Sequence, residues 1–265
     1  MGYALDLDVV QHGEVHSTFE HAINLTVDGC LWTLLARERS DMPFGIRVVS
    51  ADLGVVGVSV GDAVTVRAGY IGLGPDPVVV DCRTTPRWTP EAIPIPRPEL
   101  GRRLSAVAAV SRRRAWPESR RMAEDVVEAL GDPTALADVL SAVVGRGPGL
   151  TPAGDDVLVG IAAVVASESA GSRGQAATAA LRHSIRAALP GTTDVSAHML
   201  RQACNGLIGR AIHELVSALV GSNVRGVRDR ARRVVGIGAT SGADTCAGLL
   251  AAAPLYLPFA ERTAA

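Results

Sequence analysis

Residues 145–160 read GRGPGLTPAGDDVLVG, and this stretch decides how the second half of the chain folds. Its first part crowds glycine and proline into a few positions, which the interior of a helix does not tolerate. Its last part is apolar, so the two adjacent aspartates bring charge next to apolar neighbours. The stretch therefore predicts a turn that ends one helix and starts another. Because ordering glycines and placing aspartates beside apolar residues cost free energy, we expect local hydrogen bonds or a ligand to offset that cost.

The second helix is predicted to start at Thr151 and Pro152, with the threonine as N-cap and the proline in the first helical position. A glycine-rich turn that leads into a helix offers free N–H donors and a partial positive charge to an anion. Asp155 and Asp156 leave two alternatives open. They satisfy those donors themselves, or they bind a cation such as Mg²⁺ that bridges to a phosphate or carboxylate.

A second segment, IGATSGADTCAGLL at 237–250, repeats the pattern. Aligning Gly154 with Gly242 brings Asp156 onto Asp244, and both segments then read Gly-x-Asp-x-x-x-Gly. In each one the aspartate and the later glycine are four residues apart, so the helix face is bare one turn beyond the carboxylate. That bare face could admit a ligand or another helix, and two such helix starts could converge on one site.

Helices are predicted throughout the chain beyond residue 99, where apolar residues recur with a period of about 3.6. The high alanine and glycine content implies closely spaced helices, because small side chains let backbones approach. The predicted helices cover 99–113, 117–130, 133–144, 155–168, 174–188, 194–204, 206–220, 224–235 and 242–252.

Strands are predicted in the first part of the chain, which is rich in short β-branched runs bounded by Gly, Asp or Pro. The runs cover 23–36, with a hairpin turn at Asp28-Gly29, and 46–50, 55–60, 63–71 and 77–82. Five prolines between Thr84 and Pro98 mark a boundary. The expected fold class is α+β. A small antiparallel β-sheet or barrel covers residues 1–84, a proline-rich linker covers 85–98, and a larger Ala/Gly-rich α-helical domain covers 99–265.

All 26 basic residues are arginine, and this composition excludes several classes of function. Without lysine there is no Schiff-base lysine, phosphate-loop lysine or kinase lysine. A net charge of −1 and only 3% aromatic residues argue against general nucleic-acid binding. The seven arginines within 102–121 are the exception, and we interpret them as a solvated helix face or a subunit contact rather than a polyanion site.

The four cysteines form neither a CxxC pair nor a Cys/His cluster, which argues against structural zinc and a disulfide framework. The start of the chain lacks the pattern of a signal peptide, and no apolar run reaches membrane-spanning length. We therefore expect a cytoplasmic protein without a membrane contact. His12, His16 and His21 are too loosely spaced to predict a metal site.

GLTPAGDDVLVG together with IGATSGADTCAG resembles a bacterial family of domains of unknown function that includes the AllH-type subunit of oxamate carbamoyltransferase. The similarity extends to VHSTFEHAINLTVDGCLWTLL near the N-terminus. The second motif departs from the family pattern, with Ala239 in place of histidine and Cys246 in place of leucine. The resemblance implies that the protein is part of a transferase. That enzyme would act in purine catabolism, during the anaerobic degradation of allantoin. The chain would act in an oligomer with other subunits, among them an acyl-CoA-synthetase-like one, to transfer a carbamoyl group between carbamoyl phosphate and oxamate.

On this hypothesis the two turns bind a small anionic substrate. Asp155, Asp156 and Asp244 would be the catalytic residues, orienting the amide of oxamate or holding Mg²⁺ as a possible cofactor. The expected substrate-binding residues are Arg146, Gly147, Gly149, Thr151, Gly154, Thr240, Ser241 and Gly242. Two alternatives remain: a non-catalytic partner subunit that uses its helices as interfaces, and a Mg²⁺-dependent hydrolase of a phosphorylated small molecule.

Overall fold

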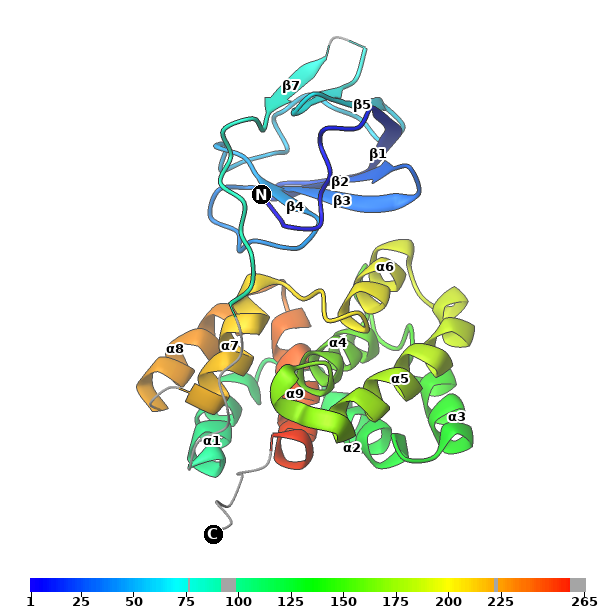
Figure 1. The fold of residues 1–265 in the computed structure, drawn as a ribbon, viewed down its shortest axis with the longest axis vertical. Coiled ribbons are helices and arrows are strands. Elements are labelled where there is room, and N and C mark those ends of the chain that lie inside the picture. The colour runs from blue at the N-terminus through cyan, green and yellow to red at the C-terminus, as the bar shows by residue number, and fades with distance from the viewer. Residues whose placement is uncertain (76, 92–98, 222–223, 258–265) are drawn as a thin grey trace. The chain divides into compact units, whose positions relative to one another are not determined.

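The computed structural model describes residues 1–75, 77–91, 99–221 and 224–257. The chain divides into two compact units, Met1–Pro90 and Glu91–Ala265. The first unit is a β-sheet and the second is helical, which confirms the predicted α+β class (Figure 1). Residues 92–98 of the predicted proline-rich linker lie outside the described residues.

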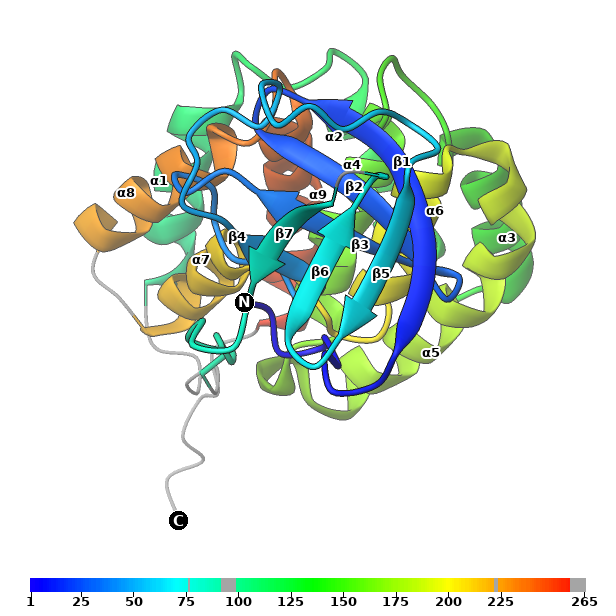
Figure 2. The ribbon, with the colours of Figure 1, turned by 90° about the horizontal axis from the view of Figure 1, so that it is seen from above.

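The first unit is built on one curled sheet, which Figure 2 shows most clearly. Its strands lie in the order β4-β3-β2-β1-β5-β6-β7. Neighbouring strands pair antiparallel except β3 and β4, which pair parallel. The predicted antiparallel sheet therefore forms, with one parallel pair that was not predicted. The strands are β1 (Gln11–Phe19), β2 (Ala22–Val27), β3 (Cys30–Leu35), β4 (Gly45–Arg47), β5 (Ala63–Arg67), β6 (Tyr70–Leu73) and β7 (Val78–Asp81).

The predicted hairpin at Asp28-Gly29 is confirmed. Asp28 has φ 44° and Gly29 has φ 76°, the positive values that a two-residue hairpin turn requires. The run at 63–71, predicted as one strand, is instead a second hairpin, because Ala68 and Gly69 also have positive φ values, 49° and 82°. Alanine gives no sequence signal for such a turn.

The prediction of a strand at 55–60 is wrong. No strand forms there, and Val55 and Val60 leave 77% and 64% of their surfaces exposed. Gly57, with φ 76°, breaks the extended backbone in the middle of the run. A β-branched run needs neighbouring strands to pack against, and local composition does not reveal whether those neighbours exist.

Helices form at all nine predicted positions in the described part of the second unit. They are α1 (Leu100–Ser111), α2 (Ser119–Ala129), α3 (Pro133–Val143), α4 (Ala153–Val165), α5 (Gly171–Ala188), α6 (Asp194–Ala203), α7 (Arg210–Gly221), α8 (Val224–Val235) and α9 (Ser241–Tyr256). Two short 3₁₀ helices flank α5, at Glu168–Ala170 and Leu189–Gly191. The largest departures are four residues: α7 starts at Arg210 rather than at residue 206, and α9 continues past its predicted end at residue 252 and contains Pro254 in its last turn.

Helix α4 is the centre of the helical unit, and every one of its 13 residues is buried. A helix that is apolar on all sides must be surrounded by other elements. Figure 1 shows α9 alongside α4, with α1, α7 and α8 on one flank and α2, α3 and α5 on the other. The two helices that carry the Gly-x-Asp-x-x-x-Gly pattern are therefore direct neighbours.

Glycines set the distance between α4 and α9. A Cβ atom on Gly160 of α4 would lie 2.0 Å from the carbonyl oxygen of Thr245 in α9, and a Cβ on Gly248 of α9 would lie 2.0 Å from the carbonyl oxygen of Val157 in α4. The contact is reciprocal, because each later glycine of the pattern meets the residue that follows the aspartate in the other copy. Each helix thus covers the bare face of the other. Of the two alternatives for these faces, a ligand or another helix, the structure has the helix.

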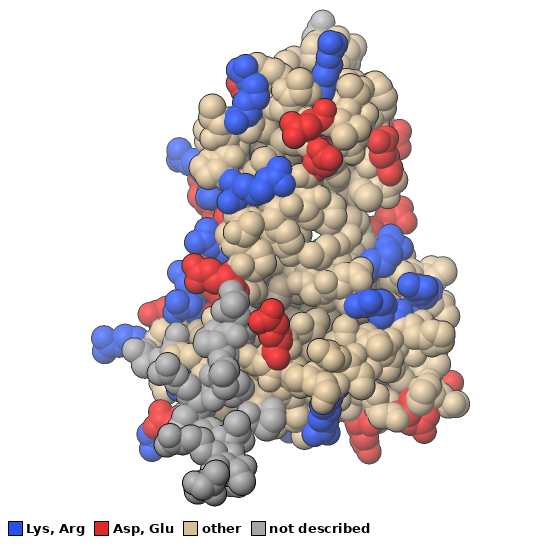
Figure 3. All heavy atoms as spheres, viewed as in Figure 1, with Lys and Arg blue, Asp and Glu red and all other residues tan. Residues whose placement is uncertain are grey.

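The charged side chains are mixed in sign over the face of the molecule drawn in Figure 3. On the helices, several arginines pair with acids three or four residues away, as Arg120 does with Glu124 at 2.8 Å. None of the helices within the described ranges is both long and apolar enough to cross a bilayer.

Candidate functional site

The two motif turns meet at the N-terminal ends of α4 and α9. The hydroxyl oxygens of Thr151, before α4, and Ser241, at the start of α9, lie 2.9 Å apart and share a hydrogen bond. Both residues are partly exposed, whereas the aspartates behind them are buried. Two segments that are distant in the sequence therefore form one cluster, with hydroxyls outside and carboxyls inside.

The turn before α4 depends on glycine. Gly145 and Gly147 have φ values of 75° and 113°, which other residues rarely adopt. A Cβ on Gly145 would also lie 2.0 Å from the carbonyl oxygen of Gly191. The predicted N-cap is wrong by one residue: Pro152 takes that position, with no side-chain cap hydrogen bond. The hydroxyl of Thr151 instead shares a hydrogen bond with Ser241.

Most of the backbone N–H groups at the two helix starts already have partners. Gly154 donates to the carbonyl of Arg146 at 2.9 Å, and Gly242 donates to the carbonyl of Ile237 at 3.0 Å. These two predicted substrate-binding amides are therefore engaged within the protein. The amides of Gly147 and Gly149 donate to no group among the described residues.

Asp155 joins three segments of the helical unit. One carboxylate oxygen accepts a hydrogen bond from the amide of Gly145 at 2.9 Å. The other accepts from the hydroxyls of Ser196 in α6, at 2.6 Å, and of Thr192. With 1% of its surface exposed, Asp155 is a buried acceptor that ties the motif turn to the start of α6. All three hydrogen bonds hold parts of the helical unit together.

Asp244 has the equivalent role in the second turn. Its Oδ1 accepts hydrogen bonds from the backbone N–H of Trp116 at 2.6 Å and from the hydroxyl of Ser119 at 2.7 Å, and the residue is fully buried. The segment between α1 and α2 is thereby held against α9. Trp116 and Ser119 lie within the arginine-rich stretch 102–121, whose composition favours a solvated helix face or a subunit contact and does not indicate these two hydrogen bonds.

Asp156 lies between the hydroxyl pair and the other carboxyls. Burial raises the pKa of its carboxyl well above the usual range, and the charges of Asp244 and Asp155 raise it further. The hydrogen bond with Ser241 lowers the pKa by more than either neighbouring charge raises it, and that with Thr151 lowers it slightly, but burial outweighs both. The neutral acid is therefore the favoured form, and it can donate a hydrogen bond.

Polar atoms without partners gather at this cluster. Within the described residues, Oδ2 of Asp156, Oδ2 of Asp244 and the indole N–H of Trp116 are buried and make no hydrogen bond. Unpaired buried polar groups are rare in folded proteins, because each costs free energy. The unpaired oxygens of Asp156 and Asp244 are consistent with carboxyls that take up a proton, a water molecule or a ligand.

Replacing Asp156 with asparagine should change how stability depends on pH. A pKa that is higher in the folded state than in the unfolded chain gives stability that is complete at low pH and is lost as the pH rises towards the folded pKa. The free energy of unfolding of the wild type should therefore fall, relative to Asp156→Asn, by up to about 1.4 kcal/mol per pH unit above pH ~4. Urea denaturation between pH 4 and 8 measures this difference.

The control is Asp138→Asn, which changes an exposed carboxyl on α3. It should shift the free energy of unfolding little at any pH. A difference between wild type and Asp156→Asn that stays constant across this range would mean that Asp156 is ionised in the folded protein.

The other predicted site residues lie at the edge of the cluster. Arg146 is exposed and pairs with Glu118 at 3.2 Å, so its charge is partly compensated. Thr240 is partly exposed and its carbonyl accepts the amides of Ala243 and Asp244. Gly149, with φ 92°, is exposed and has no heavy atom near the place where a Cβ would lie.

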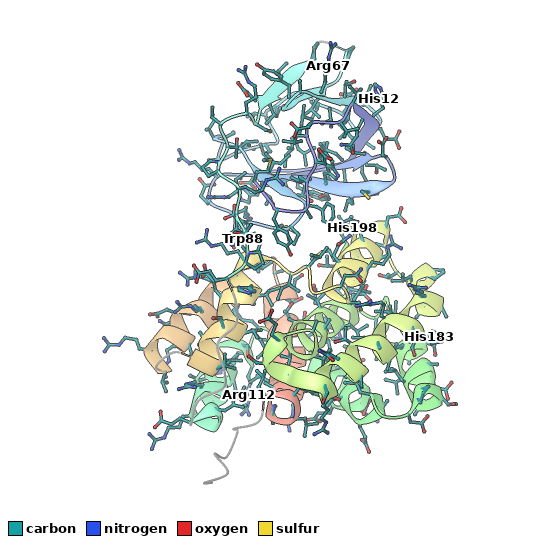
Figure 4. All side chains as sticks on the ribbon, in the orientation of Figure 1. His12, Arg67, Trp88, Arg112, His183 and His198 are labelled. Atoms are coloured by element: carbon teal, nitrogen blue, oxygen red, sulfur yellow. The ribbon has the colours of Figure 1, made fainter. Side chains whose placement is uncertain are left out.

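A metal site is not supported by the residues present. No group of three or more His, Cys, Asp or Glu side chains in the described ranges could hold a metal ion. Both oxygens of Asp155 already accept hydrogen bonds from the protein. Figure 4 shows that His183 and His198 come from α5 and α6, and His12 comes from β1 in the other unit. Burial lowers the pKa of His198 to about 4, with a smaller contribution from Arg201, so it stays neutral.

Comparison with known families identifies both units. Residues 143–253, which include α4, most of α9 and both turns, match the family model for the oxamate carbamoyltransferase subunit AllH. Residues 4–87, which include the whole sheet, match the model for the AllH family N-terminal domain. No curated protein and no solved structure was found to match the chain.

Proposed function

The chain belongs to the AllH family, and we propose that its two motif turns bind the small anionic substrate of a carbamoyltransferase that transfers a carbamoyl group between carbamoyl phosphate and oxamate. The hydrogen bond between Thr151 and Ser241 carries this proposal, because it joins the two turns at a partly exposed point. Both turns lie at helix N-termini, where the partial positive charge favours an anion.

The reaction sets what such a site must do. The amide nitrogen of oxamate attacks the carbamoyl carbon, the bond from that carbon to the phosphate oxygen breaks, and the nitrogen loses a proton. Negative charge grows on the carbamoyl oxygen and then on the leaving phosphate. Hydroxyl donors that point at these oxygens stabilise the transition state.

The hydroxyls of Thr151 and Ser241 supply such donors in the proposed site. Asp156 hydrogen bonds with both of them, and its raised pKa favours the neutral acid, which can pass a hydrogen bond or a proton towards the substrate oxygen. The amides of Gly147 and Gly149 are further donors, since they have no partner among the described residues. In this proposal Asp155 and Asp244 hold the turns in place and do not touch the substrate.

Partner subunits complete the proposed active site. Because the matching family is named as a subunit, we propose that the chain acts in an assembly that includes an acyl-CoA-synthetase-like subunit. The second turn has Ala239, a side chain that cannot accept or donate a proton, so other proton transfers in the reaction belong to other groups.

Removing either hydroxyl should weaken substrate binding. Thr151→Val and Ser241→Ala are each expected to raise the Kd for carbamoyl phosphate or oxamate by about tenfold, which corresponds to one hydrogen bond of about 1.4 kcal/mol. The measurement is the shift in melting temperature with each ligand, made on the chain alone and with its partner subunits, since a ligand of the folded state must raise the melting temperature.

Thr151→Ser is the matched control, because it keeps the hydroxyl and should bind like the wild type. If neither ligand shifts the melting temperature of the wild-type chain, alone or assembled, the site proposed here does not bind these substrates. Equal binding by the wild type and Thr151→Val would remove the hydroxyl pair from the site.

A non-catalytic partner subunit is the second candidate. It is favoured by the burial of Asp155 and Asp244, whose hydrogen bonds are all explained by holding loops together. In that case the melting temperature should rise on adding partner subunits and should not respond to carbamoyl phosphate or oxamate.

A further inference from the structure

A hollow lies on the helical unit, at the C-terminal end of α4. It has a volume of about 360 Å³ and is walled by the C-terminal end of α4, by Glu168, by one side of α5 and by Asn205-Gly206 after α6. Helix α4 has 13 residues, so its two ends are about 20 Å apart. The hollow is therefore separate from the cluster around Asp156.

One face of α5 forms the floor of the hollow. Gly171, Gln175, Thr178, Ala179 and Arg182 line it, and their spacing of four, three, one and three residues places them on a single helix face. The stripe is about 16 Å long between its end residues, because each residue advances a helix by about 1.5 Å. The hollow is thus elongated along α5.

The two ends of the hollow carry opposite charges. At one end, Nε and Nη2 of Arg182 donate to the carbonyl of Cys204 at 3.3 and 3.1 Å, which fixes the guanidinium in place. At the other end is the carboxylate of Glu168, beside the start of α5. In the described part of the chain neither group forms an ion pair with another side chain, so both charges are open to a ligand.

We propose that this hollow binds an elongated zwitterionic small molecule, with a carboxylate at Arg182 and an amino group at Glu168. A guanidinium held by two hydrogen bonds is well suited to bind a carboxylate. The side-chain amide of Gln175 lies between the two ends and would hydrogen-bond the middle of the ligand. The ligand class is therefore a long amino acid or a short peptide rather than a compact anion.

The test is a titration of the full chain with triglycine, which is about 10 Å long when extended, followed by calorimetry or by NMR. We expect saturable binding by the wild type. Arg182→Gln and Glu168→Gln should each weaken binding at least tenfold. Triglycine with acetylated and amidated ends should not bind, because it lacks both charges.

Arg186→Gln is the matched control, since Arg186 is exposed one turn further along α5 and does not line the hollow. The melting temperature of each variant is measured first and should lie within a few degrees of the wild type. A variant whose melting temperature is lower is compared with the wild type at a temperature at which both are folded. Asp156→Asn should bind triglycine like the wild type, which separates this proposal from the proposed function.

Three outcomes would overturn the proposal. The first is an absence of saturable triglycine binding to the wild type. The second is equal weakening of binding by Arg182→Gln and Arg186→Gln, and the third is equal binding of the charged and capped tripeptides. Either of the last two would show that the charges at the ends of the hollow do not select the ligand.

Discussion

Replacing Gly160 with alanine is expected to lower the free energy of unfolding by about 3 kcal/mol or more. The new Cβ would lie 2.0 Å from the carbonyl oxygen of Thr245, closer than any real contact allows, and the obstacle is backbone rather than a flexible side chain. Helices α4 and α9 would have to move apart, and the buried residues of α4 would lose packing contacts. Urea denaturation followed by circular dichroism gives the change directly.

Gly248→Ala should have the same effect, because its Cβ would meet the carbonyl oxygen of Val157 at 2.0 Å. The control is Gly101→Ala in α1, where no heavy atom lies within 4 Å of the added Cβ. That variant should be neutral or more stable by up to about 1 kcal/mol, since alanine is the better helix former. If all three variants unfold at the same urea concentration, α4 and α9 are not packed as closely as described.

Replacing Asp155 with alanine is the second change expected to have a large effect, a loss of about 3 to 5 kcal/mol in the free energy of unfolding. The amide of Gly145 and the hydroxyls of Thr192 and Ser196 would lose their shared acceptor inside the protein. Asp155→Asn should be milder but still destabilising, because one of its two acceptor oxygens becomes a donor.

The neighbouring aspartate provides the contrast. Asp156→Asn at pH 7 should be neutral or stabilising, since burial already favours the uncharged form of Asp156. Thermal and urea denaturation at pH 7 compare the free energies of unfolding of Asp155→Asn and Asp156→Asn. Equal losses at both positions would contradict the separate roles that we assign to these adjacent carboxyls.

The fold was largely predictable because its signals are local. Helices α1 to α9 follow the apolar period of the sequence, and Asp28-Gly29 marks its hairpin by composition alone. The errors arose where the outcome depends on distant neighbours or on an unusual turn residue. Residues 55–60 have the composition of a strand but no strand beside them, and Ala68 takes a left-handed conformation that glycine or asparagine would have signalled.

The candidate site was predictable only in part. The repeated pattern indicated that Asp156 and Asp244 belong together, and the Thr151–Ser241 contact joins their turns. Nothing in the sequence indicated that Asp244 accepts its hydrogen bonds from Trp116 and Ser119, because these residues reach it only through the packing of α2 against α9. Whether a carboxyl faces solvent or a loop is decided by such packing.

The complete burial of α4 has a consequence for how the protein is made. On the ribosome, chains emerge from the N-terminus, so α4 leaves the exit tunnel long before its main packing partner, α9. During that interval its apolar surface lacks its principal cover, and the nascent chain is prone to stick to other chains or to need a chaperone. A stop codon just ahead of α9 would make this exposure permanent, so the last helix of the described chain governs whether the helical unit reaches its native state at all.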